Sequence, residues 1–239
     1  MPLKYLMSLL QSKVLFVSKV VKWEDPYENF FLKQNFVLRN GKRVSREMID
    51  LCFSGIFGQS WTKKKSSDAM WRIYSLIPNK SNCIKDLGDV AVRIKTLPQQ
   101  IMDEIAPSLR GCSAEIREVE YKTEYEIKEW VKHLPTITQD NMANLILTSL
   151  FLKRDSFEHE DEVRLIIHVP SEKQFGEVLR IPITPIRIVS EFVMDPRLSN
   201  DLVTIIRNEL IHLGVDKGKI RKSRLYDLYK TTLVVDAQS

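Results

Sequence analysis

The clearest pattern in this chain is a run of alternating side chains between residues 163 and 169. Aliphatic residues occupy every second position from Val163 to Val169. Arg164 and His168 lie between them, and Pro170 ends the run. Successive side chains of a strand point to opposite faces, so the alternation predicts a β-strand with at least one buried face. The rest of the fold must supply partners for this strand.

Other predicted strands and helices follow one another at irregular spacing. Alternation predicts strands at 14–18, 88–96, 114–122, 179–183 and 188–194, and a further one beginning at 52–54. Helical spacing predicts helices at 98–109, 123–133, 139–153 and 199–213, and one that Ser66 or Ser67 caps and that ends before Pro78. Because no regular β-α-β array appears, we expect an α+β fold with a mixed or antiparallel sheet core and flanking helices.

Composition is that of an ordinary globular chain, with 44% hydrophobic and 28% charged residues among 239. No linker or repeat divides it, so we expect a single domain over residues 1–239. Three cysteines without CxxC spacing indicate neither disulfides nor zinc and fit a reducing compartment. The apolar start to Leu10 is too short for a signal peptide and no window approaches a membrane span, so we expect a cytoplasmic protein without membrane association.

The residues that could carry chemistry lie at the start of the strongest predicted strand. On an extended strand Glu160, Glu162 and Arg164 share one face, which places the two carboxylates roughly 7 Å apart beside a guanidinium. Such a pair can hold a sugar hydroxyl or stabilise a developing cation. It can also act as acid and base, because the repulsion between two neighbouring carboxylates makes their pKa values differ. The same pattern also suits an exposed strand face on which Arg164 is a weak counter-ion.

Four other candidate residues have structural readings that are at least as simple. Lys153 either brings a cation to the same site or completes a helix by complementing its C-terminal dipole. Trp71 and Tyr74, at i and i+3, form either a buried helix face or a ligand platform. Asp25, which precedes a proline, indicates a turn first and a binding loop only second.

Established catalytic signatures are absent from the sequence. It has no HExxH, P-loop, GxGxxG or GxSxG motif and only 8 glycines. The histidines form no metal spacing with Cys or Asp, although His159 stands beside Glu160. A metal-dependent nuclease built on Glu160 and Glu162 would need a further clustered acidic residue that the sequence does not identify.

The basic residues indicate a second class of function. The net charge is only +5, and the densest cluster is Lys63-Lys64-Lys65 beside Trp61. A run of this kind is usually a solvated loop, but it can also contact phosphate. The alternative to an enzyme is therefore a non-enzymatic nucleic-acid or nucleotide binding module.

Six short motifs succeed one another along most of the chain. They are Lys4-Tyr5, Asp25-Pro26-Tyr27-Glu28, Cys52-Phe53-Ser54, Met70-Trp71 with Tyr74, Val119 with Tyr121, and Lys153, Phe157, Glu160, Glu162 and Arg164. Each motif is short, but their order resembles a bacterial domain-of-unknown-function family, numbered 2971.

A Glu-x-Glu pair after an aromatic helix and an early basic-aromatic segment is also similar to the layout of ADP-ribosyltransferases. This resemblance implies an enzyme that consumes NAD as a substrate, either a transferase or an NAD glycohydrolase. It implies that Glu162 is the catalytic carboxylate, which supports the cationic ribosyl group as nicotinamide leaves. Glu160 would orient the acceptor, a protein or a nucleic acid, and Arg164 would orient both carboxylates.

The same resemblance assigns residues to cofactor binding and a biological role to the chain. The residues that would contact NAD are Lys4, Tyr5, Trp71, Tyr74 and Arg164. The implied role is that of a toxin or a phage-defence effector.

Overall fold

The computed structural model describes residues 1–23, 25, 27–28, 30–38, 40–78, 83–170, 176–228 and 230–232. The chain forms two compact units. Unit 1 contains Met1–Gln11, Ser66–Lys95 and Val189–Ser239, and unit 2 contains Ser12–Lys65 and Thr96–Ile188. Each unit is assembled from separate stretches of the chain. The boundary between the units is therefore not marked by a linker segment in the sequence. One domain over residues 1–239 stays a prediction, because compactness does not show whether either unit folds alone.

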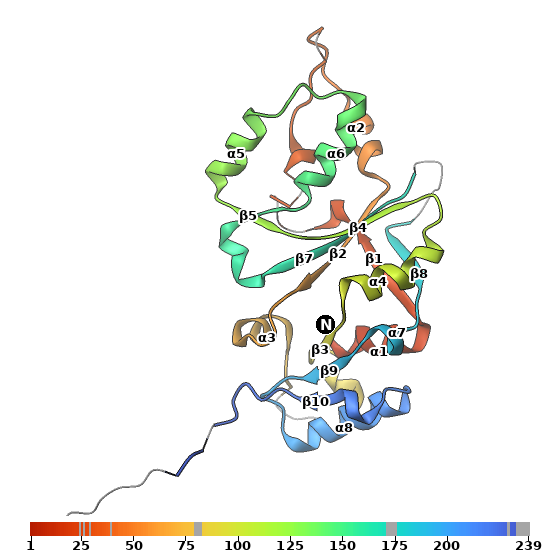
Figure 1. The fold of residues 1–239 in the computed structure, drawn as a ribbon, viewed down its shortest axis with the longest axis vertical. Helices are drawn as coiled ribbons and strands as arrows, with labels where there is room; N and C mark the ends of the chain where they lie inside the picture. Colours follow the sequence, from red (N-terminus) through yellow and green to blue (C-terminus); the bar gives the residue numbers. More distant parts are fainter. Residues whose placement is uncertain are drawn as a thin grey trace, which may run out of the picture. The chain divides into compact units, whose positions relative to one another are not determined.

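Unit 2 is built around a five-stranded sheet (Figure 1). The five strands of this sheet are β1 (Val14–Lys19), β2 (Ile56–Thr62), β4 (Ser113–Glu118), β7 (Glu162–His168) and β8 (Val178–Pro182). Two further strands of unit 2, β5 (Glu120–Lys122) and β6 (Leu152–Arg154), form a separate pair. The α-helices of unit 2 are α2 (Arg46–Phe53), α4 (Pro98–Ile105), α5 (Glu124–Lys132), α6 (Gln139–Ser149) and α7 (Pro185–Ile188). The sheet has the order β4-β7-β2-β1-β8 with antiparallel neighbours, and β5 pairs with β6 in parallel.

Strand β7 confirms the strongest prediction from the sequence and lies inside this sheet. It pairs with β2 over its whole length, from Glu162 opposite Thr62 to His168 opposite Ile56. On its other edge it pairs with β4. Both faces of its centre are buried, because Leu165 and Ile166 point to opposite sides and neither is more than 1% exposed.

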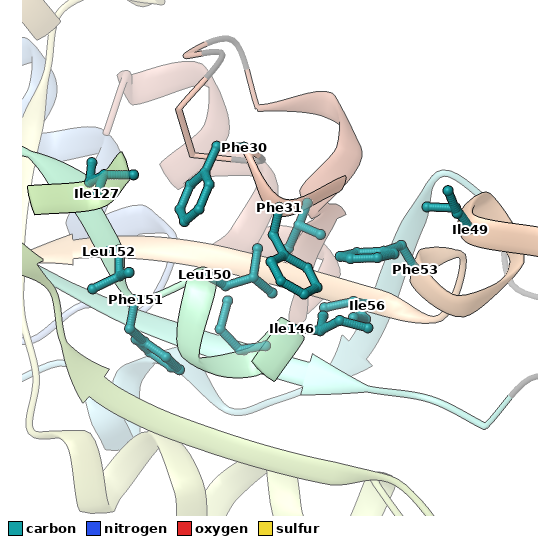
Figure 2. Packing of buried hydrophobic residues seen from close by; sticks show 12 residues of the cluster. Phe30, Phe31, Ile49, Phe53, Ile56, Ile127, Ile146, Leu150, Phe151 and Leu152 are labelled. Atoms are coloured by element: carbon teal, nitrogen blue, oxygen red, sulfur yellow. The ribbon is translucent and has the colours of Figure 1, made fainter. Parts of the chain in front are cut away.

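A hydrophobic cluster joins the sheet of unit 2 to α2, α5 and α6 (Figure 2). Its buried residues are Val20, Phe30, Phe31, Ile49, Phe53, Ile56, Ile127, Ile146, Leu150, Phe151, Leu152 and Ile166. Phe31 makes edge contacts with Phe36 and Trp130, at ring-centre distances of 5.4 and 6.2 Å. Burial of large aliphatic and aromatic side chains is the main favourable contribution to folding here.

The helices α5 and α6 begin where the sequence predicts. The side-chain hydroxyl oxygens of Thr123 and Thr138 each accept a hydrogen bond from the backbone N–H three residues later. The side chains of those later residues, Glu126 and Asn141, in turn accept the backbone N–H of the threonine. These capping boxes satisfy amide groups that a helix start leaves unpaired. Local side chains therefore fix both starting points.

Unit 1 has a small mixed sheet with helices around it. Its elements are α1 (Leu3–Ser12), α3 (Asp68–Tyr74), β3 (Val92–Lys95), β9 (Glu191–Met194), α8 (Asn200–His212) and β10 (Ile220–Lys222). Strand β9 is central, antiparallel to β3 and parallel to β10. Ser67 and Ser199 cap α3 and α8. Arg197 donates to the carbonyls of Trp71 and Ser75 at the end of α3, and it pairs with the fully buried Asp195 at 2.7 Å.

Several predicted boundaries are wrong. The strand predicted at 188–194 begins only at Glu191, because Ile188 ends helix α7. The segment 52–54 does not start a strand, because residues 52–53 complete α2. Helix α6 ends at Ser149, so Lys153 lies on the short strand β6 instead of a helix terminus. The predicted strand at 114–122 divides at Val119 into β4 and β5, which pair with different strands. Periodicity cannot separate short apolar segments of helix and strand, so pairing partners decide them.

The fold class is confirmed as α+β, with a largely antiparallel sheet, a mixed sheet and flanking helices. In the described part of the chain, no helix combines the length and the apolar composition that crossing a membrane requires.

Gly58 of β2 marks a close contact that the sequence does not reveal. A Cβ atom at this position would lie 2.4 Å from Cζ2 of Trp23 and 3.1 Å from Cδ1 of Ile166. The indole of Trp23 therefore lies directly on the strand, and this position needs glycine because of space.

We expect Gly58→Ala to lower the free energy of unfolding by about 1–3 kcal/mol, since the added methyl group overpacks this contact. Urea denaturation followed by circular dichroism measures the change. Gly176→Ala is the matched control, because a Cβ there meets no atom within 4 Å. Equal stability of the two variants would contradict the contact between Trp23 and β2.

Candidate functional site

A buried ammonium group forms the centre of the candidate site in unit 2. Lys153 lies on β6, and 7% of its side chain is exposed. Its Nζ lies 2.6 Å from Glu160 Oε2, 3.0 Å from Glu162 Oε2 and 3.0 Å from Glu28 Oε1. One lysine therefore binds two carboxylates of the segment that follows it and a third, Glu28, from a distant part of the sequence.

A second cation, which is fully buried, binds two of the same carboxylates. Arg164 donates from Nε to Glu162 Oε1 at 2.8 Å and from Nη2 to Glu162 Oε2 at 3.0 Å. Nη2 also donates to Glu28 Oε1 at 2.6 Å, and Nη1 donates to the Leu150 carbonyl at 2.6 Å. The guanidinium lies 4.5 Å from the ring centre of Trp23. This two-pronged bond with Glu162 fixes the orientation of the carboxylate. The alternative of an exposed strand face is wrong, because Arg164 is 0% and Glu162 only 3% exposed.

Glu160 does not lie on strand β7, contrary to the prediction. It ends the 3-10 helix Asp155–Glu160, and Asp161 has a left-handed φ of 47° before β7 begins. Aspartate is one of the few residues besides glycine that adopt this conformation readily. The separation of Glu160 and Glu162 that an extended strand would give therefore does not apply. The two carboxylates still converge, because the backbone turns between them.

Glu28 is the residue of the cluster that sequence reasoning missed. The turn predicted there is present, since Asp25 Oδ1 accepts the Tyr27 N–H at 3.0 Å; Pro26 lies outside the described residues. This turn places Glu28 beside Lys153 and Arg164. No local pattern could connect residues so far apart in the chain. The only signal was the succession of motifs, in which both segments appear.

Aromatic rings border the cluster beside a neighbouring ion pair. Lys153 Nζ lies 4.8 Å from the ring centre of Phe157. The Arg154 guanidinium lies 4.5 Å from the ring centre of Tyr27 and 5.4 Å from that of Phe157. Arg154 also pairs with Asp25 at 3.0 Å. These cation–π contacts tie the turn to β6 and to the 3-10 helix.

The charges of the cluster hold its central groups ionised. Burial by itself would lower the pKa of Lys153, but the hydrogen bond to Glu160 and the charges of Glu162 and Glu28 outweigh it and raise that pKa. Burial would raise the pKa of Glu162. The hydrogen bond and charge of Arg164, with smaller contributions that include a Ser60 hydrogen bond, lower it instead. The three carboxylates outnumber the two cations, so the cluster has a formal net charge of −1.

Access to the cluster differs among its members. The side chain of Glu160 is 17% exposed and that of Glu28 is 12% exposed, while Glu162 is almost covered. Ser60, which bonds to Glu162, is itself exposed. The hydroxyl of Tyr121 on β5 accepts the backbone N–H of Glu162 at 2.8 Å. A ligand would therefore meet Glu160 and Glu28 first.

The other predicted NAD contacts lie in unit 1. Lys4 pairs with Asp89 at 2.6 Å on the surface, and its hydrogen bond to that carboxylate raises the pKa of Lys4. Tyr5 and Tyr74 are exposed. Trp71 is buried in a small core cluster of unit 1, so the helix-face reading applies to it. The contact of these four residues with NAD stays a prediction.

Two of the three lysines in the run 63–65 pair with acidic residues. Lys63 lies 2.7 Å from Glu118 and 3.3 Å from Asp161, and Lys64 lies 3.9 Å from Asp161. The Lys63 N–H also donates to the Asp161 carbonyl at 2.9 Å. These contacts anchor the segment after β2 to the turn before β7. They partly neutralise the charge that would attract phosphate, and the binding-module alternative stays a prediction.

Lys153 occupies the position between the carboxylates at which another cation would bind. Among the described residues, no group of three or more His, Cys, Asp or Glu side chains is arranged to hold a metal ion. The metal-dependent nuclease therefore has no described ligand set.

Comparisons with protein-family models, with curated proteins and with solved structures gave no match. The resemblances to family 2971 and to ADP-ribosyltransferases therefore stay predictions from the sequence.

We expect Lys153→Met to lower the free energy of unfolding by about 3–5 kcal/mol, because it leaves buried carboxylates without their shared cation. Chemical denaturation measures this change. Lys128→Met is the control: Lys128 pairs with Glu124 at 2.8 Å on an exposed helix face, where little stability is lost. Similar losses in the two variants would contradict a central role for Lys153.

The lowered pKa of Glu162 predicts how stability depends on pH. A carboxylate with a lowered folded-state pKa stabilises the protein above its unfolded pKa of about 4.3, and this contribution is lost as the pH falls through the folded value. The free energy of unfolding should therefore fall more steeply below about pH 4 in the wild type than in Glu162→Gln. Denaturation series from pH 7 to pH 3 test this. Parallel pH profiles would mean that Glu162 is not held ionised by Arg164.

Proposed function

We propose that this chain is an NAD-consuming enzyme of the ADP-ribosyltransferase type, acting as a transferase or an NAD glycohydrolase. The observation that carries the proposal is the acidic cluster around Lys153, in which three ordered carboxylates leave a net charge of −1 in a largely buried setting. Cleavage of a glycosidic bond develops positive charge on the sugar. Fixed carboxylates stabilise such charge without having to reorganise during the reaction.

The two cations, Lys153 and Arg164, favour the charged form of the carboxylates, which is the form that can stabilise a positive charge. Carboxylates this close together normally repel, so that one of them takes up a proton and loses its charge. Lys153 counteracts the repulsion, and Arg164 lowers the pKa of Glu162. Glu162 can therefore act through a fixed negative charge at neutral pH.

The roles of the two glutamates follow from their exposure. Glu162 is fixed and nearly covered, and it supplies the charge that supports the ribosyl cation. Glu160 is more exposed, and it faces the incoming acceptor. The bond from ribose C1 to the nicotinamide nitrogen breaks, and nicotinamide leaves with the electron pair. Water, or a nucleophile on a protein or nucleic acid, forms the new bond and gives its proton to Glu160.

Nicotinamide release from NAD, followed by chromatography, tests the proposal directly. Glu162→Gln and Glu160→Gln should each lower turnover by about 100-fold or more, since each removes charge that stabilises the transition state. Near-ultraviolet circular dichroism shows whether each variant is folded. Glu158→Gln, an exposed residue of the same 3-10 helix, is the matched control and should keep full activity.

Two results would refute this function. One is a wild-type protein that neither binds NAD nor releases nicotinamide in the presence of protein and nucleic-acid acceptors. The other is turnover that persists in a folded Glu160→Gln variant at the level of Glu158→Gln.

A further inference from the structure

Tyr121 is placed beside the acidic cluster by two independent contacts. Strand β5 pairs with β6 so that Tyr121 lies opposite Lys153. Its hydroxyl oxygen accepts the backbone N–H of Glu162 at 2.8 Å. The phenol is therefore held at the start of β7, and the charges of Glu162, Lys153 and Glu160 all act on it.

The hydroxyl of Tyr121 has a proton that it can still donate. A phenol is both a donor and an acceptor, and the Glu162 N–H uses only its acceptor side. Within the described ranges, no protein atom receives the proton of Tyr121. The bond from Glu162 also polarises the O–H group, which makes it a better donor. Burial raises the pKa of Tyr121, so the phenol keeps its proton at neutral pH.

The Tyr121 hydroxyl lies near enough to Glu160 for the charge of that partly exposed carboxylate to act on it. A donor and an acceptor in this arrangement match one kind of ligand group. An ionised carboxylate such as Glu160 only accepts hydrogen bonds, while the O–H of Tyr121 donates. A sugar hydroxyl can satisfy both, because it donates through its hydrogen and accepts through its oxygen. A phosphate group would offer acceptors only, and the negative charge of the cluster would repel it.

We infer that the Tyr121 hydroxyl is a ligand-binding donor, which together with the Glu160 carboxylate holds one ribose hydroxyl of the substrate. The inference rests on the proposed function and adds the part of the substrate that this pair contacts. Tyr121 binds and orients the sugar, and it takes no part in bond breaking.

A variant and a substrate analogue together test this contact. Tyr121→Phe should lower kcat/KM for NAD by about fivefold to tenfold, which corresponds to one lost hydrogen bond. Tyr125→Phe is the matched control, because Tyr125 is 70% exposed on α5. Thermal unfolding shows whether Tyr121→Phe alters stability through the bond to Glu162.

NAD analogues that lack one hydroxyl of the nicotinamide ribose show whether Tyr121 binds that hydroxyl or only supports the structure. If Tyr121 and Glu160 hold a hydroxyl together, removing that hydroxyl should lower kcat/KM of the wild type by about fivefold to tenfold more than that of Tyr121→Phe, because the variant has only the bond to Glu160 left to lose. Equal losses in both proteins for each analogue would overturn the inference while leaving the proposed function intact.

Titration with ADP-ribose provides a readout that does not depend on turnover. This compound carries the same ribose but cannot release nicotinamide. A weaker Kd in Tyr121→Phe than in Tyr125→Phe would support the contact even where the wild type lacks NAD turnover. An unchanged Kd, or no binding to the wild type, would overturn it.

Discussion

The buried guanidinium of Arg164 is the interaction on which the organisation of unit 2 depends. It is 0% exposed, and it joins Glu162 of its own strand, Glu28 of a distant turn and the carbonyl of Leu150 after α6. A buried charge without partners costs several kcal/mol, so the chain can cover Arg164 only if all three segments arrive in this arrangement. An apolar residue of similar size would need no such match. We therefore expect the ion network to contribute specificity to the pairing of these segments as well as stability.

Structure and the proposed chemistry are coupled in this cluster, because the same charges would serve both. Lys153 compensates the carboxylates that would otherwise repel one another, and it thereby allows negative charge to be concentrated in this largely buried cluster. A site of this kind is expensive to build in a protein interior. Changes to its members should consequently affect folding and ligand interactions together, which is why exposed neighbours and isosteric replacements are the informative comparisons.

Residues from three of the motifs that resemble family 2971 lie together in unit 2. The second motif supplies Glu28, the fifth supplies Tyr121, and the last supplies Lys153, Glu160 and Arg164 with the intervening Glu162. Segments that are far apart in sequence thus contribute to one connected network of hydrogen bonds and ion pairs. The first and fourth motifs lie in unit 1, where Trp71 has a packing role. The convergence in unit 2 brings these residues into one cluster, and the binding and turnover experiments test the task proposed for it.

The sequence by itself determined the features that depend on local order. Alternation from Val163 to Val169 predicted β7, Thr123 and Thr138 began helices with their own side chains, and the irregular mixture of elements indicated an α+β fold. Tertiary structure decided the rest. It moved Lys153 from a helix end to β6, because β5 offered a pairing partner, and it buried a charge pair that looked like an exposed strand face. It also added Glu28 to the site. Such features depend on which segments meet in space, and a one-dimensional pattern carries no information about a partner more than a hundred residues away.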